Sequence, residues 1–114
     1  MAIQNWIGGG AAAYLSETGI SAAGTTQATA TTLRAQDSEV TTVASGAGVV
    51  LNPLFAPAEE MTVFNVGANP LKIYPPSGMQ INNLPTNTAM SLSPNTGVLF
   101  HCVSTTRIMG ILSA

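Results

Sequence analysis

The sequence contains very little charge. Only 7% of its 114 residues are charged, with three Lys or Arg and five Asp or Glu, against about 25% in an ordinary soluble protein. The cations are Arg34, Lys72 and Arg107, too few to form the basic patch that holds nucleic-acid phosphates. We therefore expect no nucleic-acid partner. Weak charge repulsion between copies also favours an oligomer or a component of a larger assembly.

Cysteine and long apolar runs are also scarce. Cys102 is the single cysteine, so no intramolecular disulfide can form, which suits folding inside a cell. The first residues lack the Lys/Arg region of a signal peptide, and Gly8–Gly10 break their apolar run. No stretch reaches the ~18 consecutive apolar residues of a membrane-spanning helix. We expect no membrane partner and synthesis in the cytoplasm of the cell that makes it.

The residues that usually bind metals are not grouped in the sequence. His101 and Cys102 are adjacent, so in a strand they point to opposite faces, and neither type occurs a second time. The close acidic pairs, Glu59-Glu60 and Asp37 with Glu39, lack the ligand spacing of a calcium loop. We expect His101 at a rim or interface, Cys102 in the core, and no bound metal.

Motifs for catalysis, phosphate binding and sugar binding are missing as well. The glycine-rich stretch 45–48 lacks the Lys-Ser/Thr of a P-loop, and no serine lies in a G-x-S-x-G elbow. We expect neither an enzyme nor a cofactor. Sugar binding usually needs an exposed aromatic platform. Most of the six aromatic residues, Phe64 among them, are expected in the core, although Tyr74 before two prolines could be exposed.

What the sequence does contain is a series of short β patterns. The central one runs from Glu60 to Ser77, where apolar runs at 61–66 and 71–74 flank Gly67-Ala68-Asn69-Pro70. β-Branched and aromatic residues fit a strand, while Gly, Asn and Pro favour a turn. This arrangement predicts a β-hairpin.

The same reading along the chain predicts about eight short strands and no helix. The candidate segments, nine in all, are 25–35, 38–43, 49–51, 61–66, 71–74, 79–82, 88–92, 98–103 and 107–112. Strands at this spacing are typical of an all-β fold with two sheets. We predict a jelly-roll-like antiparallel β-sandwich over residues 25–114.

Residues 1–24 differ from the rest and are expected to form an extended N-terminal arm. Trp6 and Ile7 lie before the three glycines. They could fold back on the edge of their own domain or anchor in a neighbouring subunit. The segments 98–103 and 107–112 are apolar on both faces, so the second face is expected to be covered by the arm or by another subunit.

The central region resembles small structural proteins of tailed bacteriophages. These carry a recurring pattern, N-x-G-A-N-x-x-x-x-Y-P-x-x-G-x-x-I-N, and the likeness covers roughly residues 25–112. In this chain the pattern falls on Asn65, Gly67, Ala68, Asn69, Tyr74, Pro75, Gly78, Ile81 and Asn82. These are turn and packing residues, and such a pattern occurs both in head decoration proteins and in modules of tail fibres.

The resemblance implies a capsid decoration (cement) protein, a homotrimer that binds the major capsid protein on the outside of the phage head. A short chain that opens with its own Met favours this over a fibre domain. Its location would be the virion. Trp6, Ile7 and Tyr14 are the expected contacts to the shell or to a neighbour, and His101 and Met109 are candidates for the subunit interface. The alternative is a receptor- or glycan-binding module of a tail appendage.

Overall fold

Ten β-strands form two sheets in residues 14–113, the part of the chain that the computed structural model describes, and this part contains no helix. The strands are β1 (Tyr14–Ser21), β2 (Thr31–Thr32), β3 (Ala35–Thr42), β4 (Gly48–Val50), β5 (Glu60–Asn65), β6 (Leu71–Tyr74), β7 (Gln80–Ile81), β8 (Met90–Leu92), β9 (Thr96–Cys102) and β10 (Arg107–Leu112). The predicted all-β fold with two sheets is confirmed.

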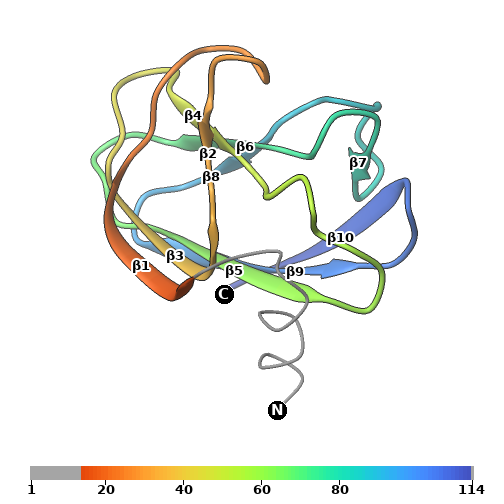
Figure 1. Ribbon diagram of the computed structural model, residues 1–114. Coiled ribbons are helices and arrows are strands. Elements are labelled where there is room, and N and C mark those ends of the chain that lie inside the picture. The colour runs from red at the N-terminus through yellow and green to blue at the C-terminus, as the bar shows by residue number, and fades with distance from the viewer. Residues whose placement is uncertain (1–13, 114) are drawn as a thin grey trace.

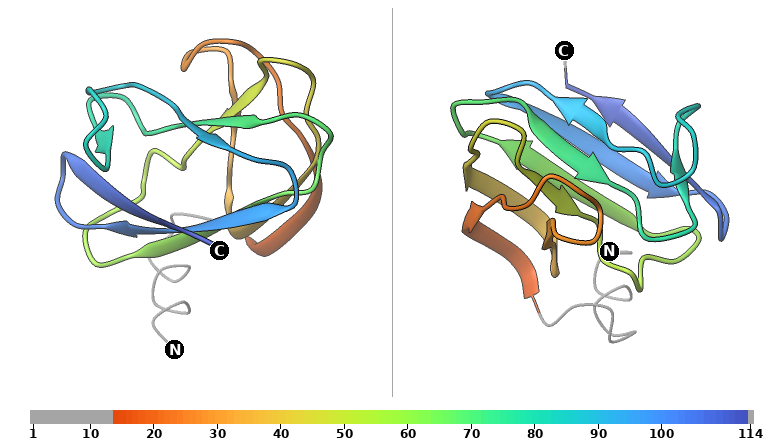
Figure 2. Two further views of the ribbon diagram at one scale, coloured as in Figure 1. Left: turned by 180° about the vertical axis from the view of Figure 1, so that it is seen from behind. Right: turned by 90° about the horizontal axis from the view of Figure 1, so that it is seen from above.

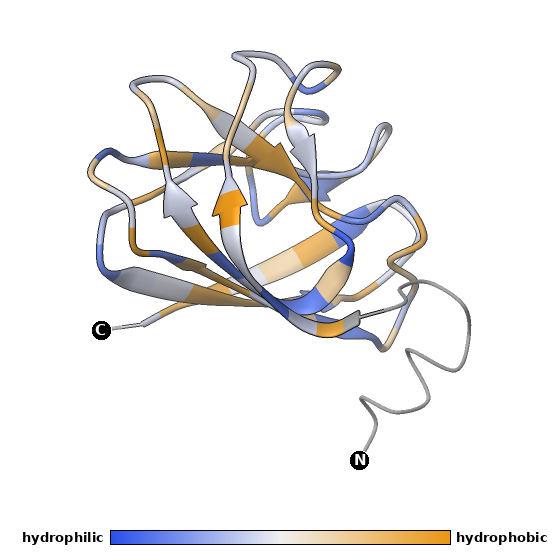
Figure 3. Cartoon of the chain, turned by 60° about the vertical axis from the view of Figure 1, so that its left-hand side comes forward, coloured by the Kyte–Doolittle hydropathy of each residue, from blue (hydrophilic) through white to orange (hydrophobic). Residues whose placement is uncertain are grey.

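The two sheets are stacked one above the other (Figures 1 and 2). One has six strands in the order β1-β3-β5-β9-β10-β7, and the other has four in the order β2-β4-β6-β8. Apolar and polar segments alternate along the strands (Figure 3). The largest fully buried side chains include Phe100, Leu51, Met61, Leu71 and Ile73, which come from both sheets and from the loop after β4. The core therefore lies between the layers.

The chain winds between the sheets in a solenoid-like manner. From β1 to β9, consecutive strands lie in opposite sheets. In β1-β3-β5 and in β2-β4-β6-β8 each strand lies beside the one formed a turn earlier, whereas β7 lies beside β10 and β9 lies beside β5. Asp37 of β3 pairs with Thr62 of β5, and Val49 of β4 with Ile73 of β6, both in parallel. Five of the eight strand pairs are parallel. The antiparallel jelly-roll arrangement predicted from the sequence is not confirmed.

The predicted central hairpin is wrong, because β5 and β6 lie in different sheets. The residues between them form a corner that crosses from one layer to the other. Asn65 is fully buried; its Nδ2 donates to the carbonyls of Asn69 and Leu92, at 3.0 and 2.9 Å, and its Oδ1 accepts from the Gly67 amide at 2.9 Å. A Cβ at Gly67 would lie 2.7 Å from Cγ2 of Val43, so the corner needs glycine there.

The predicted strand 25–35 is also wrong over most of its length. Only Thr31–Thr32 form a strand, and residues 25–30 form a turn. The Thr26 and Thr29 hydroxyls lie 2.8 Å apart, and the Ala30 amide donates to the Thr26 carbonyl at 3.0 Å. Threonine side chains that bond nearby backbone compete with strand pairing in this way.

The described part of the predicted arm, residues 14–24, lies along the edge of the six-stranded sheet. β1 pairs in parallel with β3, with Tyr14 opposite Ala35. Ile20 and Ala22 are buried in the core. Trp6 and Ile7 lie outside the described residues.

Candidate interaction surface

The six-stranded sheet presents one side to the core and one to solvent, and three neighbouring strands carry large apolar side chains on the solvent side as well as on the core side. Along β5, β9 and β10, burial alternates from residue to residue. The inward positions are Met61, Val63, Val98, Phe100, Cys102 and Ile108, all buried. The alternate positions point outward: Glu60, Thr62 and Phe64 on β5, Leu99 and His101 on β9, and Arg107, Met109 and Ile111 on β10. We call these eight residues the outer face.

Large apolar side chains on the outer face are exposed. Phe64 is 45% exposed and Ile111 63%. Thr62, Phe64, Leu99 and Ile111 line a shallow hollow of about 230 Å³. Contiguous exposed apolar patches on a protein surface mark interaction sites.

The strand register places these side chains in rows across the sheet. Thr62, Leu99 and Ile111 are direct partners on the three strands. Phe64 pairs with Gly97, where an added Cβ would lie 2.6 Å from the ring atom Cδ1 of Phe64. The ring therefore lies across β9, because glycine leaves the space for it. This contact brings Phe64 to the margin of the hollow and keeps the surface there shallow.

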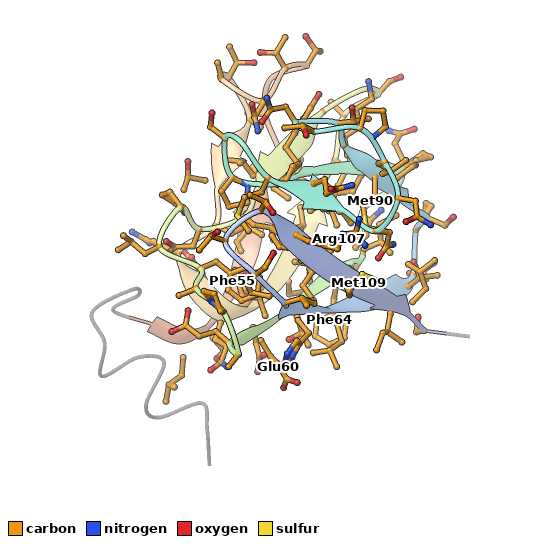
Figure 4. The ribbon with its side chains drawn as sticks, turned by 90° about the vertical axis from the view of Figure 1, so that its right-hand side faces the viewer. Phe55, Glu60, Phe64, Met90, Arg107 and Met109 are labelled. Carbon is orange, nitrogen blue, oxygen red and sulfur yellow. The ribbon has the colours of Figure 1, made fainter. Side chains whose placement is uncertain are left out.

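Charged groups border the apolar centre. Asp37 and Glu39, on the neighbouring strand β3, accept hydrogen bonds from the hydroxyls of Thr62 and Thr18 respectively. Glu60 stands at the end of β5, with its Oε2 3.3 Å from Nδ1 of His101. Figure 4 looks onto β10 with Arg107 and Met109 along it. One border of the face is therefore acidic, and the opposite strand carries a cation.

The predicted interface residues His101 and Met109 are direct partners on β9 and β10, and both are partly exposed on this face. Tyr14 begins β1, two strands away from β5 in the same sheet. Its side chain, like the whole of Trp6 and Ile7, lies outside what the structure describes. The structure therefore brings together the two weaker candidates from the sequence and leaves the three arm candidates untested.

Sequence reasoning missed Phe64 as a surface residue. Leu99 and Ile111 lie on strands predicted to be apolar on both faces, but they were not singled out as contacts. Phe64 was expected in the core, but it is 45% exposed. The alternation in 61–66 does indicate that Phe64 faces the opposite way from Met61, Val63 and Asn65. Met61 and Val63 on one face are matched by Phe64 and Val66 on the other, so the pattern left it undecided which face was inside.

The other candidate groups are located elsewhere in the molecule. Tyr74 is buried, and its hydroxyl donates to the Thr25 carbonyl at 2.9 Å, so it offers no aromatic platform for a sugar. Cys102 is buried, and its Sγ lies 3.2 Å from the Ser104 carbonyl. Burial, followed by the negative charge of Glu59, raises the pKa of this thiol above its ordinary value.

Within residues 14–113 no three His, Cys, Asp or Glu side chains come together in a way that could hold a metal ion. In the same range no helix is long and apolar enough to cross a membrane. Comparison with protein-family models, with curated proteins and with solved structures finds no match for this chain. The candidate function is therefore argued from the outer face and from the chain's own residues.

Proposed function

We propose that this protein is a structural component of a bacteriophage head, a decoration protein that binds the outer surface of the shell. The observation that most supports a role as one component of a protein assembly is the outer face, where Phe64, Met109 and Ile111 are exposed on regular strands. Such a surface serves contact between proteins. The low charge of the chain and the resemblance of its corner and turn residues to phage structural proteins support the same class of function.

The proposed mechanism is mechanical. The protein associates as a trimer, and each copy makes weak contacts with a shell subunit. Once one copy is bound, the effective concentration of the others at their sites rises, so the trimer binds far more tightly than one copy alone. Removing a shell subunit then requires several contacts to break together, which stabilises the head against internal pressure.

A receptor- or glycan-binding module of a tail appendage is the alternative that the resemblance leaves open. The burial of Tyr74 removes the aromatic platform that favoured sugar binding. Phe64 is an exposed aromatic ring, but the hollow that it lines with Leu99 and Ile111 is almost wholly apolar and offers few partners for sugar hydroxyls. The head protein therefore remains the proposal.

The test is a binding assay with purified protein and undecorated heads of the phage that encodes it. Sedimentation of the heads should carry the protein down in hundreds of copies per particle. A chain lacking residues 1–10 should stay folded and oligomeric but no longer coat heads, because Trp6 and Ile7 are the proposed shell contacts. Failure of the full chain to bind, or a count of only a few dozen copies in the virion, would contradict the proposal.

A further inference from the structure

The charges on and around the outer face are distributed in a way that a second copy of this chain can match. Asp37 and Glu39 stand on β3, beside β5. Arg107 stands on β10, on the same side of the strand as Met109 and Ile111. The exposed apolar side chains lie between these two borders. We call Arg107 the basic border of the outer face, and Asp37 with Glu39 its acidic border. When the basic border of one copy approaches the acidic border of another, opposite charges face each other across the contact.

The other cations are not available to this face. Arg34 forms an ion pair with Glu17, with Nη2 2.8 Å from Oε2. Lys72 lies on β6, in the four-stranded sheet. Arg107 is thus the one Lys or Arg on the outer face within residues 14–113. A basic shell surface would attract the acids but repel Arg107, whereas a second copy supplies both signs of charge in reverse order.

We propose that the outer face is the contact between copies of this chain, with the Arg107 border of one copy against the Asp37 and Glu39 border of the next. This inference deepens the proposed function and rests on its self-association. Borders of unlike charge also meet in a face-to-face pair, which is isologous and stops at two copies. In the proposed arrangement each copy meets a different neighbour at each of its two borders, so the contact is heterologous and closes into a ring when the rotation allows it. Three copies closing in this way form the proposed trimer.

The apolar and charged residues have separate roles in this contact. Phe64, Leu99 and Ile111 lose water and supply most of the stability, because apolar area removed from water is the main favourable term in association. The border charges fix the relative orientation of two copies in the contact, and they raise the rate at which two copies associate. Binding to the shell is then left to other parts of the chain.

Charge exchange tests the pairing of the borders. Three variants are measured by sedimentation equilibrium at low salt: Arg107→Glu, the double variant D37K/E39K, and the combination of all three substitutions. Each one-sided variant should raise the dissociation constant of self-association by about tenfold or more, because like charges then face each other. The combined variant should restore association to within about threefold of the original chain, because the two signs have only changed places.

A matched control separates the border from a general effect of charge. Lys72→Glu makes the same change in net charge as Arg107→Glu but lies in the other sheet. It should leave self-association unchanged. Circular dichroism should show the same β-sheet spectrum for every variant, since these side chains are not part of the core.

The apolar centre is tested by Ile111→Asp, with Leu54→Asp as its control. The two side chains are almost equally exposed, at 63% and 60%, but Leu54 lies in the loop between β4 and β5. Ile111→Asp should give a folded monomer, and Leu54→Asp should keep the original mass.

Two outcomes overturn this inference and leave the proposed function standing. In the first, the variants keep their mass but no longer coat heads, which would mean that the face binds the shell. In the second, the original chain is a monomer that still coats heads. A third outcome separates the two proposals in the other direction. If the chain associates through this face but neither the original protein nor any variant binds heads, the inference holds and the decoration function fails.

Discussion

Cys102 shows how a chemically reactive side chain is made inert by its surroundings. It is fully buried on the inward side of β9, and burial together with the charge of Glu59 raises the pKa of its thiol. Both causes oppose the negative thiolate, which is the reactive form. A structural role for this cysteine could be predicted from the sequence, because in a strand the adjacent His101 points to the opposite face and neither residue type occurs a second time.

This environment predicts slow reaction with thiol reagents and a stability that falls at high pH. The folded-state pKa is raised above the ordinary value of 9.0, so the stabilisation is fully present below about pH 9 and is lost as pH rises through the folded-state pKa. A disulfide reagent at pH 8 should modify the folded protein at least about tenfold more slowly than the urea-unfolded chain. In urea titrations from pH 7 to 10, Cys102→Ala should flatten the decline in stability above pH 9. Equal modification rates for folded and unfolded protein would contradict this account.

Phe64 marks the limit of sequence reasoning at the residue scale. Its aromatic ring favours burial, and the alternation of the strand was compatible with either face being inside. Its partner on the neighbouring strand is Gly97, 33 positions later in the chain. Because Gly97 has no Cβ, the Phe64 ring has room to lie across β9. A local pattern does not contain this information.

At the scale of elements, strands next to strong turn signals were predicted well. β10 has the predicted limits, and β9 lies within two residues of them, because Pro94-Asn95 before β9 and polar residues after it mark the ends. The hairpin between β5 and β6 failed for the opposite reason. Gly67 to Pro70 do turn the chain, but the direction of the turn is set by Asn65, which reaches the Leu92 carbonyl of the other sheet.

The corner predicts a large loss of stability for Asn65→Ala. The substitution leaves the carbonyls of Asn69 and Leu92 and the Gly67 amide without their side-chain partner. We expect a loss of about 2–4 kcal/mol in the free energy of unfolding, measured by urea denaturation.

Asn83→Ala is the matched control, because Asn83 is exposed. It should change the free energy of unfolding by less than about 0.5 kcal/mol. Equal, small effects for the two substitutions would show that the corner does not depend on Asn65.

At the scale of the whole molecule, composition and turn spacing predicted an all-β fold with two sheets, and the parallel coil was missed. The choice between antiparallel and parallel pairing depends on contacts such as Asp37 with Thr62 and Val49 with Ile73. The two residues of each pair are separated in sequence by about one turn of the solenoid-like winding. Parallel and antiparallel pairing would both use the same short apolar segments, so the local sequence does not distinguish them. The segments 98–103 and 107–112 were predicted to be apolar on both faces, and Met109 and Ile111 are exposed on the outer face; the cover predicted for this face stays a prediction.

The most direct test of the account is the mass of the full chain in solution, measured by light scattering after gel filtration at micromolar concentration. The proposed ring of three copies has a mass of about 35 kDa, three times the 11.6 kDa of one chain, and this is the expected result. A single species of 11.6 kDa that does not associate as its concentration rises would contradict the claim that the face is a contact between copies.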